Sequence, residues 1–399
     1  MRVLIGKPPE KGCIGVGVLS GTSVDGIDVG LVRLCGAGEN TKAELLAFRT
    51  YPIPKAIREK ILRNLNPEKA TLQELSQLHF LIGDLFADAV QKLLDEENFP
   101  KKNLDFVASH GQTFWHQPTP ERIGKHFVRS TFQLGEASLI AAKLGVVTVS
   151  DFRPAELPLG GEGAPLMPYL DYILFRHPKQ NRALLNIGGI SNITVLKKGC
   201  KKNEVIFFDC GPGNILLDKA AQHFFQKPYD RDARFAKRGK VSEKILDVLL
   251  KEPYYRLPPP KSTGRELFSD AYFERILQIC SDAGLSGPDV IATLTELTVL
   301  AISQQYITFV LPAVQIDELI VSGGGAQNPL MMTRLQQVFP SVRVVRQDDL
   351  QQSPNERAIP AKAKESVLFA VLGNDLLSGL SASLRTKAML GKISLPPVS

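Results

Sequence analysis

The sequence predicts an α/β fold built from two related domains. Residues 14–34 and residues 183–196 each contain two apolar, β-rich segments joined by a glycine-containing turn, and helical patterns follow both runs. A chain of 399 residues is also longer than a single hydrophobic core usually reaches. A similar unit near the start of each half favours two domains with a central cleft over one continuous sheet.

The first half opens with the run IGVGVLSGTSVDGIDVGLVRL, whose residues 21–26 have the composition of a permissive turn. One helix is expected around residues 55–65. A longer helix begins at Thr71, where Thr71 and Glu74 are spaced as a capping box. Its apolar residues recur at helical spacing and predict a face that docks on a sheet: Leu72, Leu75, Leu78, Ile82, Leu85, Phe86 and Val90.

Two further strands are expected before the middle of the chain. The block DFVASHGQTFWHQP, residues 105–118, predicts a strand that runs into a glycine-containing loop, and VVTVSDFR, residues 146–153, predicts a short strand. The Pro- and Gly-rich residues 154–168 then suggest a crossover between domains. The predicted domains are therefore residues 1–158 with 360–399, and residues 159–359.

The second half repeats the opening pattern with a turn at residues 190–192. A third apolar run, residues 205–208, predicts a strand that ends at Asp209, before a Gly-Pro-Gly turn and a helix. Residues 317–338 predict a strand, three glycines and a helix, an arrangement that brings backbone N–H groups close to a nucleotide. A last helix, around residues 363–378, is expected to pack on the first domain in one layer with the long first helix.

Composition excludes several classes of protein. The formal net charge is only +7, and the one basic run, Lys197 to Lys202, has no interleaved aromatic residues, which favours a solvated hairpin tip over nucleic-acid binding. Five widely spaced cysteines without a CxxC pair argue against a disulfide framework and a zinc site. No signal peptide or membrane-spanning run is recognisable. We therefore expect a soluble, cytoplasmic protein with small-molecule partners, no nucleic-acid or membrane partner, and room for a homodimer.

Three carboxylates lie beside glycines at expected loop or strand positions: Asp25, Asp28 and Asp209. Asp25 has an alternative interpretation as a turn residue that bonds its own loop. Asp209 follows four apolar residues, and a carboxylate at the end of a buried strand is costly unless it is paired, hydrogen-bonded or catalytic.

Polar residues of the first half suggest sugar contacts. His110 and His116 lack a third ligand at metal-binding spacing, so His110, Gln112 and Thr113 are more plausible as groups facing a sugar. Trp115 fits either a stacking platform or a core position. Arg153 fits either a clamp for an anionic group or an ion-pair partner of Asp151.

Three glycine loops together resemble the two phosphate loops and the adenosine loop of the actin, hexokinase and Hsp70 superfamily, whereas the GxxxxGK[ST] signature of P-loop kinases is absent. Several longer strings occur in order: SGTSVDGID, SHGQTFWHQP, DFRPAELPLGGEGAPLMP, LLNIGGISNIT, FDCGPGN, PPPKSTGRELF, LIVSGGGAQNPLM and a late Glu365. With these strings the chain closely resembles anhydro-N-acetylmuramic acid kinases from about residue 14 to about residue 378.

The resemblance implies two RNase H-like, actin-like ATPase domains and an ATP-dependent kinase that uses Mg. It implies that such an enzyme opens 1,6-anhydro-N-acetylmuramic acid with water and phosphorylates the released oxygen, giving N-acetylmuramic acid 6-phosphate in peptidoglycan recycling. It assigns Asp209 as general base, and His110, Gln112, Arg153 and Glu365 as sugar contacts. The nucleotide contacts implied are Gly21, Thr22, Ser23, Val24, Asp25, Gly26, Ile27, Asp28, Gly188, Gly189, Gly211, Gly213, Gly323, Gly324 and Gly325.

Two departures from the family pattern occur near Arg153. The family often has two basic residues and an aspartate after DFR, and GGQG further on, where this chain has Pro154, Ala155, Glu156 and then Glu162. Another sugar kinase of the same fold, or an actin- or chaperone-like ATPase, remains an alternative function, because a fold does not select a substrate.

Overall fold

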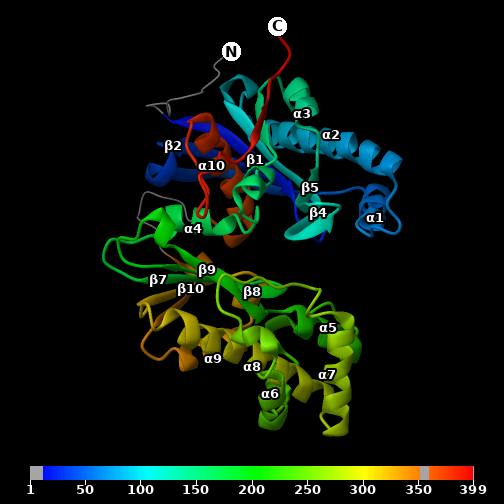
Figure 1. Cartoon of the computed structure of the whole chain (residues 1–399), viewed down its shortest axis with the longest axis vertical. Coiled ribbons are helices and arrows are strands. Elements are labelled where there is room, and N and C mark those ends of the chain that lie inside the picture. Colours follow the sequence, from blue (N-terminus) through cyan, green and yellow to red (C-terminus); the bar gives the residue numbers. More distant parts are fainter. Residues whose placement is uncertain (1–11, 351–358, 399) are drawn as a thin grey trace. The chain divides into compact units, whose positions relative to one another are not determined.

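The computed structural model describes residues 12–350 and 359–398. The chain forms two compact units, Met1–Leu174 with Gln352–Ser399, and Phe175–Gln351 (Figure 1). The division comes at Phe175, after residues 154–168, where a crossover was expected. Those residues form a 3-10 helix, Pro154–Leu159, and the start of helix α4. The functional roles of the two units remain predictions.

The first unit is built on a mixed sheet with the strand order β12-β6-β4-β1-β2-β3, and β5 pairs with β4 beside this path. Neighbours β1, β2 and β3 are antiparallel, whereas β4 runs parallel to β1 and β6 parallel to β4. The strands are β1 (Cys13–Ser20), β2 (Gly26–Cys35), β3 (Lys42–Pro52), β4 (Phe106–Ile123), β5 (His126–Leu134), β6 (Val147–Ser150) and β12 (Lys392–Ser394).

Strand alternation gives this sheet two buried faces. Val16 and Val18 of β1 belong to the apolar core formed with helix α2. The alternate residue Gly17 faces helix α10, where an added Cβ would lie 1.7 Å from the Ser366 carbonyl oxygen. The long first helix and the last helix therefore cover opposite faces, and the expectation that they share a layer is wrong. The helices of this unit are α1 (Lys55–Asn64), α2 (Leu72–Glu96), α3 (Ala137–Leu144), α4 (Met167–Phe175) and α10 (Lys364–Leu377).

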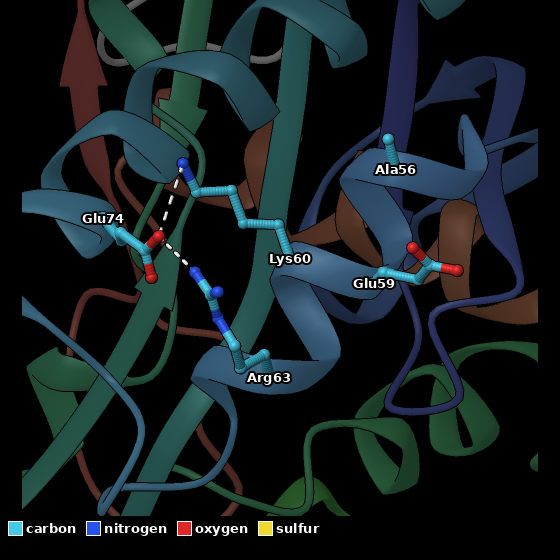
Figure 2. Close-up of a pocket in the computed structure, with 5 residues that line it drawn as sticks. All are labelled: Ala56, Glu59, Lys60, Arg63 and Glu74. Carbon is cyan, nitrogen blue, oxygen red and sulfur yellow. Dashed lines mark hydrogen bonds and ion pairs between the residues drawn. The ribbon is translucent and has the colours of Figure 1, made fainter.

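The predicted start of the long helix is confirmed, but only half of its capping box forms. Thr71 Oγ1 accepts a hydrogen bond from Glu74 N at 3.2 Å. The Glu74 carboxylate turns instead toward helix α1, where it accepts a hydrogen bond from Arg63 and lies 3.7 Å from Lys60 Nζ (Figure 2). It also accepts a hydrogen bond from Asn64. Two cations attract the carboxylate more strongly than one backbone amide does.

The second unit has the sheet order β11-β10-β7-β8-β9, with β7, β8 and β9 antiparallel and β10 and β11 parallel to β7. Its strands are β7 (Arg182–Ile187), β8 (Ile190–Leu196), β9 (Ile206–Pro212), β10 (Glu318–Ser322) and β11 (Arg343–Arg346). Its helices are α5 (Ile215–Phe225), α6 (Glu243–Leu249), α7 (Asp270–Asp282), α8 (Gly287–Gln305) and α9 (Pro329–Val338), and they contribute to one core against the sheet (Figure 1).

The five strands β3-β2-β1-β4-β6 of the first sheet have the same order and directions as β9-β8-β7-β10-β11 of the second, and the first sheet adds β5 and β12. The prediction of two related α/β domains is confirmed. Boundaries differ in three places. The turn between β7 and β8 is Gly188–Gly189, and residues 190–192 already belong to β8. Asp209 lies inside β9, opposite Asn192. Gly111 lies inside β4 at a bulge, with φ +79°, and not in a loop.

One helical stretch, Gly287–Val310, has the length and hydropathy that a membrane span would need, but 83% of its most apolar window is buried inside the protein. It includes α8, which supplies much of the second core. All five cysteines are free.

Candidate active site

The first glycine loop joins β1 to β2 and is held from outside by helix α1. Arg58 Nε donates to the Val24 carbonyl at 2.9 Å, and its Nη2 lies 3.4 Å from both the Ser23 carbonyl and Asp25 Oδ1. Val24 is fully buried with φ 54°, a strained value for a β-branched residue. The exposed carboxylate of Asp25 therefore pairs with Arg58 of helix α1. This pairing differs from the alternative interpretation, in which Asp25 bonds its own loop. Gly21 has open space where a side chain would be.

Further along the same hairpin, Asp28 is a partly buried carboxylate. Thr50 Oγ1 donates to Asp28 Oδ1 at 2.6 Å. Burial raises the pKa of Asp28, while the Thr50 hydrogen bond and the charge of Lys362 oppose this rise. Asp28 in turn helps to raise the pKa of Glu365 on α10, although burial of Glu365 is the larger cause. Two of the predicted site carboxylates are thus electrostatic neighbours within the first unit.

Arg153 is hydrogen-bonded to His110 and interacts electrostatically with Glu365. Its Nε donates to His110 Nε2 at 2.9 Å, and its Nη1 donates to the Gly163 carbonyl at 3.1 Å. Burial lowers the pKa of Arg153 to about 10, and the carboxylate of Glu365 opposes that shift. The guanidinium is therefore a half-buried cation whose charged form is favoured by a carboxylate of the same unit. The alternative pairing with Asp151 is not observed, because Asp151 pairs with Lys392 at 3.0 Å.

His110 is buried and stacks on Phe369, with ring centroids 4.5 Å apart. Because Nε2 accepts from Arg153, the proton belongs on Nδ1, which lies 3.3 Å from the Gly111 carbonyl. Burial, reinforced by the charge of Arg153, holds the pKa of His110 well below its usual value. His110 is a neutral ring that orients Arg153, so its assignment as a direct sugar contact remains a prediction.

Gln112 and Trp115 occupy contrasting positions on β4. Gln112 is completely buried, and no group in the described parts of the chain bonds its Oε1. Trp115 is 45% exposed and pairs with Phe132 of β5, which excludes a core position for its ring.

The two family departures near Arg153 have structural partners. Buried Glu156 accepts from Gly163 N at 3.2 Å and from Ser383 Oγ. Glu162 pairs with Arg385 at 2.7 Å. Both glutamates tie residues 154–163 to the C-terminal segment of the first unit.

In the second unit, the glycine turn between β7 and β8 is bound to the start of helix α5. Gly213 N donates to the Gly189 carbonyl at 2.8 Å, and Asn214 N donates to the Gly188 carbonyl at 2.8 Å. A Cβ on Gly213 would lie 2.3 Å from the Gly188 carbonyl oxygen. Gly213 is therefore required by close approach of two chain segments, whereas Gly189 has open space around it. Direct nucleotide contacts by these glycines remain a prediction.

Asp209 lies on the last antiparallel strand, β9, and is partly buried. Its Oδ2 accepts a hydrogen bond from Thr263 N at 2.9 Å. Burial raises the pKa of Asp209 to about 6, although the Thr263 amide favours the ionised form. A carboxylate of this kind is mostly ionised at neutral pH yet basic enough to accept a proton.

The third glycine loop follows β10 and borders a cavity of ≈ 390 Å³. A Cβ on Gly323 or Gly325 would come within 2.7 Å of Ile187, so these two glycines allow the loop to lie against β7. Gly324 faces the cavity, and its nearest neighbour would be Asn214 Nδ2 at 3.3 Å. The cavity is lined by Asn214, Leu217, Asp218, Tyr229, Asp230, Arg231, Asp232, Gly324, Gln327 and Asn328.

Asp218 of α5 also lines this cavity, and burial alone raises its pKa to about 6. Asp230, by contrast, accepts from the Phe235 and Ala236 amides and has a structural role. The sequence reasoning missed Asp218, whose only signal is its place on the helix after the Gly-Pro-Gly turn.

A second, more open pocket lies on the first unit between α1 and the start of α2 (Figure 2). Its two cations, Lys60 and Arg63, both lie against Glu74. With Glu59 as the second carboxylate of the lining, the charges balance, so this pocket adds nothing to the candidate site. No cluster of three or more His, Cys, Asp or Glu suitable for a metal ion occurs in residues 12–350 and 359–398.

Three residues that contact the predicted site residues, Arg58, Lys261 and Thr263, were also missed by sequence reasoning. Arg58 lies 34 positions from the carbonyl that it binds, and Lys261 and Thr263 come from a loop far along the chain from Asp209. The string PPPKSTGRELF contains Lys261 and Thr263, but nothing in its composition indicates that it lies against β9.

Comparison with known proteins covers nearly the whole chain. The family model for anhydro-N-acetylmuramic acid kinase matches residues 14–392. A protein of that name from Caldanaerobacter subterraneus is 38% identical over 388 residues, which cover 95% of this chain and 96% of the relative. One from Salinibacter ruber is 39% identical over 387 residues, 96% of each chain.

Among solved structures, the activator of the 2-hydroxyisocaproyl-CoA dehydratase from Clostridium difficile with bound ADPNP overlaps 92% of this chain and 96% of its own. It is 9% identical, with a TM-score of 0.43. This overlap is too weak to support a functional conclusion.

Proposed function

The chain belongs to the anhydro-N-acetylmuramic acid kinase family and is a kinase, and we propose that it uses ATP and water to convert 1,6-anhydro-N-acetylmuramic acid into N-acetylmuramic acid 6-phosphate. The observation that carries the proposal is Asp209, a partly buried carboxylate with a raised pKa on a strand of the second unit. Sequence similarity over nearly the whole chain supports the substrate.

The proposed reaction changes two bonds to the same sugar oxygen. A water oxygen attacks the anomeric carbon, the bond from that carbon to the bridging oxygen breaks, and the bridging oxygen takes the γ-phosphoryl group of ATP. ADP leaves with the electron pair of the broken P–O bond. Because the phosphoryl group captures the leaving oxygen, the reaction does not need the acid that ordinary glycoside hydrolysis uses.

Asp209 is proposed to remove a proton from the attacking water. The Thr263 amide occupies Oδ2 at 2.9 Å, which leaves Oδ1 as the basic oxygen. With a pKa of about 6, the carboxylate is ionised at neutral pH, and burial keeps it more basic than an exposed aspartate. The rate should therefore fall as pH drops through about 6.

For the sugar, we propose the charged groups of the first unit. Arg153 is oriented by its hydrogen bond to His110, and Glu365 is an exposed residue of α10 whose carboxylate favours the charged form of Arg153. The carboxylate of a muramic acid suits a half-buried guanidinium. Gln112 Oε1 is a buried acceptor suited to a hydroxyl or amide donor.

For ATP, we propose the glycine loops. The cavity beside Gly324 is proposed to take the adenosine, because its carboxylates Asp218 and Asp232 would repel phosphates but accept hydrogen bonds from ribose hydroxyls. The first loop, Gly21 to Asp28, is proposed to bind phosphates. Magnesium would enter with ATP, since Mg²⁺ is held mainly by phosphates and water, and would offset charge on the transferred group. We further propose a cytoplasmic location and a role in peptidoglycan recycling.

The first test is Asp209→Asn, which keeps size and hydrogen bonding but removes the basic oxygen. We expect kcat to fall at least about a hundredfold, because a positioned base contributes roughly 10² to 10⁴ in rate, or about 3 to 5 kcal/mol. Calorimetry should give sugar and nucleotide affinities within about tenfold of wild type. Turnover near the wild-type rate would show that Asp209 is a structural carboxylate.

The substrate is tested in the same assay with heavy-oxygen water. Label should enter the sugar at its anomeric position and not the phosphate, since water attacks carbon. Label in phosphate would indicate a plain ATPase. Phosphorylation of ordinary hexoses in preference to the anhydro sugar would indicate another sugar kinase.

A further inference from the structure

Lys261 lies in a cage of aromatic rings next to the proposed base. Its ammonium is 4.7 Å from the centroid of Tyr254, 4.8 Å from that of Phe309 and 5.9 Å from that of Phe208. Distances below about 6 Å allow cation–π attraction, which grows when water is excluded. Nζ also donates to Gln305 Oε1 at 2.5 Å and to the Tyr254 carbonyl at 3.3 Å. The ammonium is therefore fixed from several sides.

The same residue joins its loop to the strand that carries Asp209. Asp209 N donates to the Lys261 carbonyl at 3.2 Å, and two residues later Thr263 N donates to Asp209 Oδ2 at 2.9 Å. The Tyr254 hydroxyl adds a hydrogen bond to the Asp209 carbonyl at 2.8 Å. The backbone and one carboxylate oxygen of Asp209 are thus held by a loop whose anchor is the Lys261 side chain.

Resting on the proposed function, we propose that Lys261 is a positioning residue: it anchors residues 261–263 against β9, orients the Asp209 carboxylate, and contributes a fixed positive charge to its surroundings. Nothing in the proposed chemistry requires Lys261 to touch either substrate. Its effect is exerted through Asp209.

The charges around Asp209 support this role. Burial is the main cause that opposes ionisation of Asp209, and the Thr263 amide favours it. Among the charges, Glu266 opposes ionisation and Lys261 favours it; Tyr254 and Cys210 are the other titratable neighbours. Burial lowers the pKa of Lys261 to about 8, and the neighbouring Cys210 and Asp209 oppose this shift. Between pH 5 and pH 7 the ammonium therefore stays mostly charged, which is the range in which Asp209 titrates.

The test is the pH profile of kcat/KM for Lys261→Met, which keeps an unbranched apolar stem without the charge. Removing the cation should raise the pKa of Asp209, so the acid limb should move from near 6 to higher pH by roughly half a unit or more. The loss of activity should consequently be greater at low pH than at pH 7.5. KM for both substrates should change less than kcat.

Lys261→Arg keeps the charge and should return the acid limb toward the wild-type position. Lys261→Gln, which keeps donors for Gln305 and the Tyr254 carbonyl, serves the same test if the methionine variant does not fold. Tyr254→Phe keeps the ring but removes the hydroxyl bond, so its acid limb should stay in place. Equal loss at every pH, or an unshifted limb in a folded neutral variant, would overturn the proposal.

Asp209→Asn in the same assay separates this inference from the function on which it rests. An active asparagine variant would remove Asp209 as base and with it the mechanism on which this inference rests, whereas failure to phosphorylate the anhydro sugar by the wild-type protein would reject the proposed function itself. An inactive asparagine variant together with an unshifted Lys261→Met profile would reject only the role of Lys261.

Discussion

The two related hairpins, β1–β2 and β7–β8, occupy equivalent places in their sheets but are stabilised differently. The loop between β1 and β2 is long, contains the strained Val24, and is bound from outside by one side chain, Arg58. The turn between β7 and β8 is two glycines, whose carbonyls accept hydrogen bonds from the backbone at the start of α5. The first hairpin loop is therefore held by a side chain of helix α1, whereas the second is held by backbone hydrogen bonds from the start of helix α5.

This difference separates two uses of glycine. Gly213, Gly323 and Gly325 let backbone segments approach the second hairpin, and an added Cβ would come within 2.7 Å of neighbouring atoms. Gly189 and Gly324 have no such close constraint from the protein. We therefore expect substitutions of the first group to act on stability, and a substitution that fills the cavity to act on ligand binding.

The largest expected effect is that of Gly213→Val. Its Cβ would lie 2.3 Å from the Gly188 carbonyl oxygen, so the contact between the second hairpin and α5 cannot form without backbone movement. We expect a loss of about 3 kcal/mol in the free energy of unfolding, measured with urea. Gly189→Ala is the matched control, with a change within about 0.5 kcal/mol, because no atom lies within 4 Å of the new Cβ. Equal stability of the two variants would refute the distinction.

Gly324→Val should affect the nucleotide more than the fold. The new side chain points to the cavity and meets only Asn214 Nδ2 at 3.3 Å. Calorimetry should show ATP affinity reduced about tenfold or more, equivalent to about 1.4 kcal/mol, with sugar affinity preserved. Gly323→Val, at φ +80° and 2.7 Å from Ile187, should instead lower stability. Unchanged ATP affinity in folded Gly324→Val would argue against adenosine in this cavity.

The smallest effect is expected for Arg58→Ala, which releases the first loop. Its side chain is 41% exposed, so its bonds to the loop are screened and worth about 1 kcal/mol, or about fivefold in KM for ATP. Arg58→Lys should recover part of this loss. Lys55→Ala on the same helix, at a side chain 90% exposed, is the control and should leave KM unchanged. No change in KM for Arg58→Ala would show that the loop holds its shape without this clamp.

Local patterns were sufficient for much of the fold. The helical spacing after Thr71, the strand and glycines of residues 317–338, and the two glycine-joined hairpins all appear as expected. These features depend on interactions between residues close in sequence, such as the hydrogen bond from Glu74 N to Thr71 Oγ1. The boundary errors lie at Gly111, at Asp209 and at residues 190–192 beside Gly188 and Gly189, where local composition allows both turn and strand.

The sequence by itself determined the fold class, the family resemblance and the candidate carboxylate Asp209. Only the tertiary structure revealed which groups surround that carboxylate, because Lys261 and Thr263 reach it across more than fifty residues of chain. Only the tertiary structure showed that Gly323 and Gly325 pack closely on Ile187 whereas Gly324 does not. It alone also showed the hydrogen bond between Arg153 and His110. Burial, which sets the raised pKa of Asp209 and the lowered pKa of Lys261, is a property of the packed chain and has no local signature in the sequence.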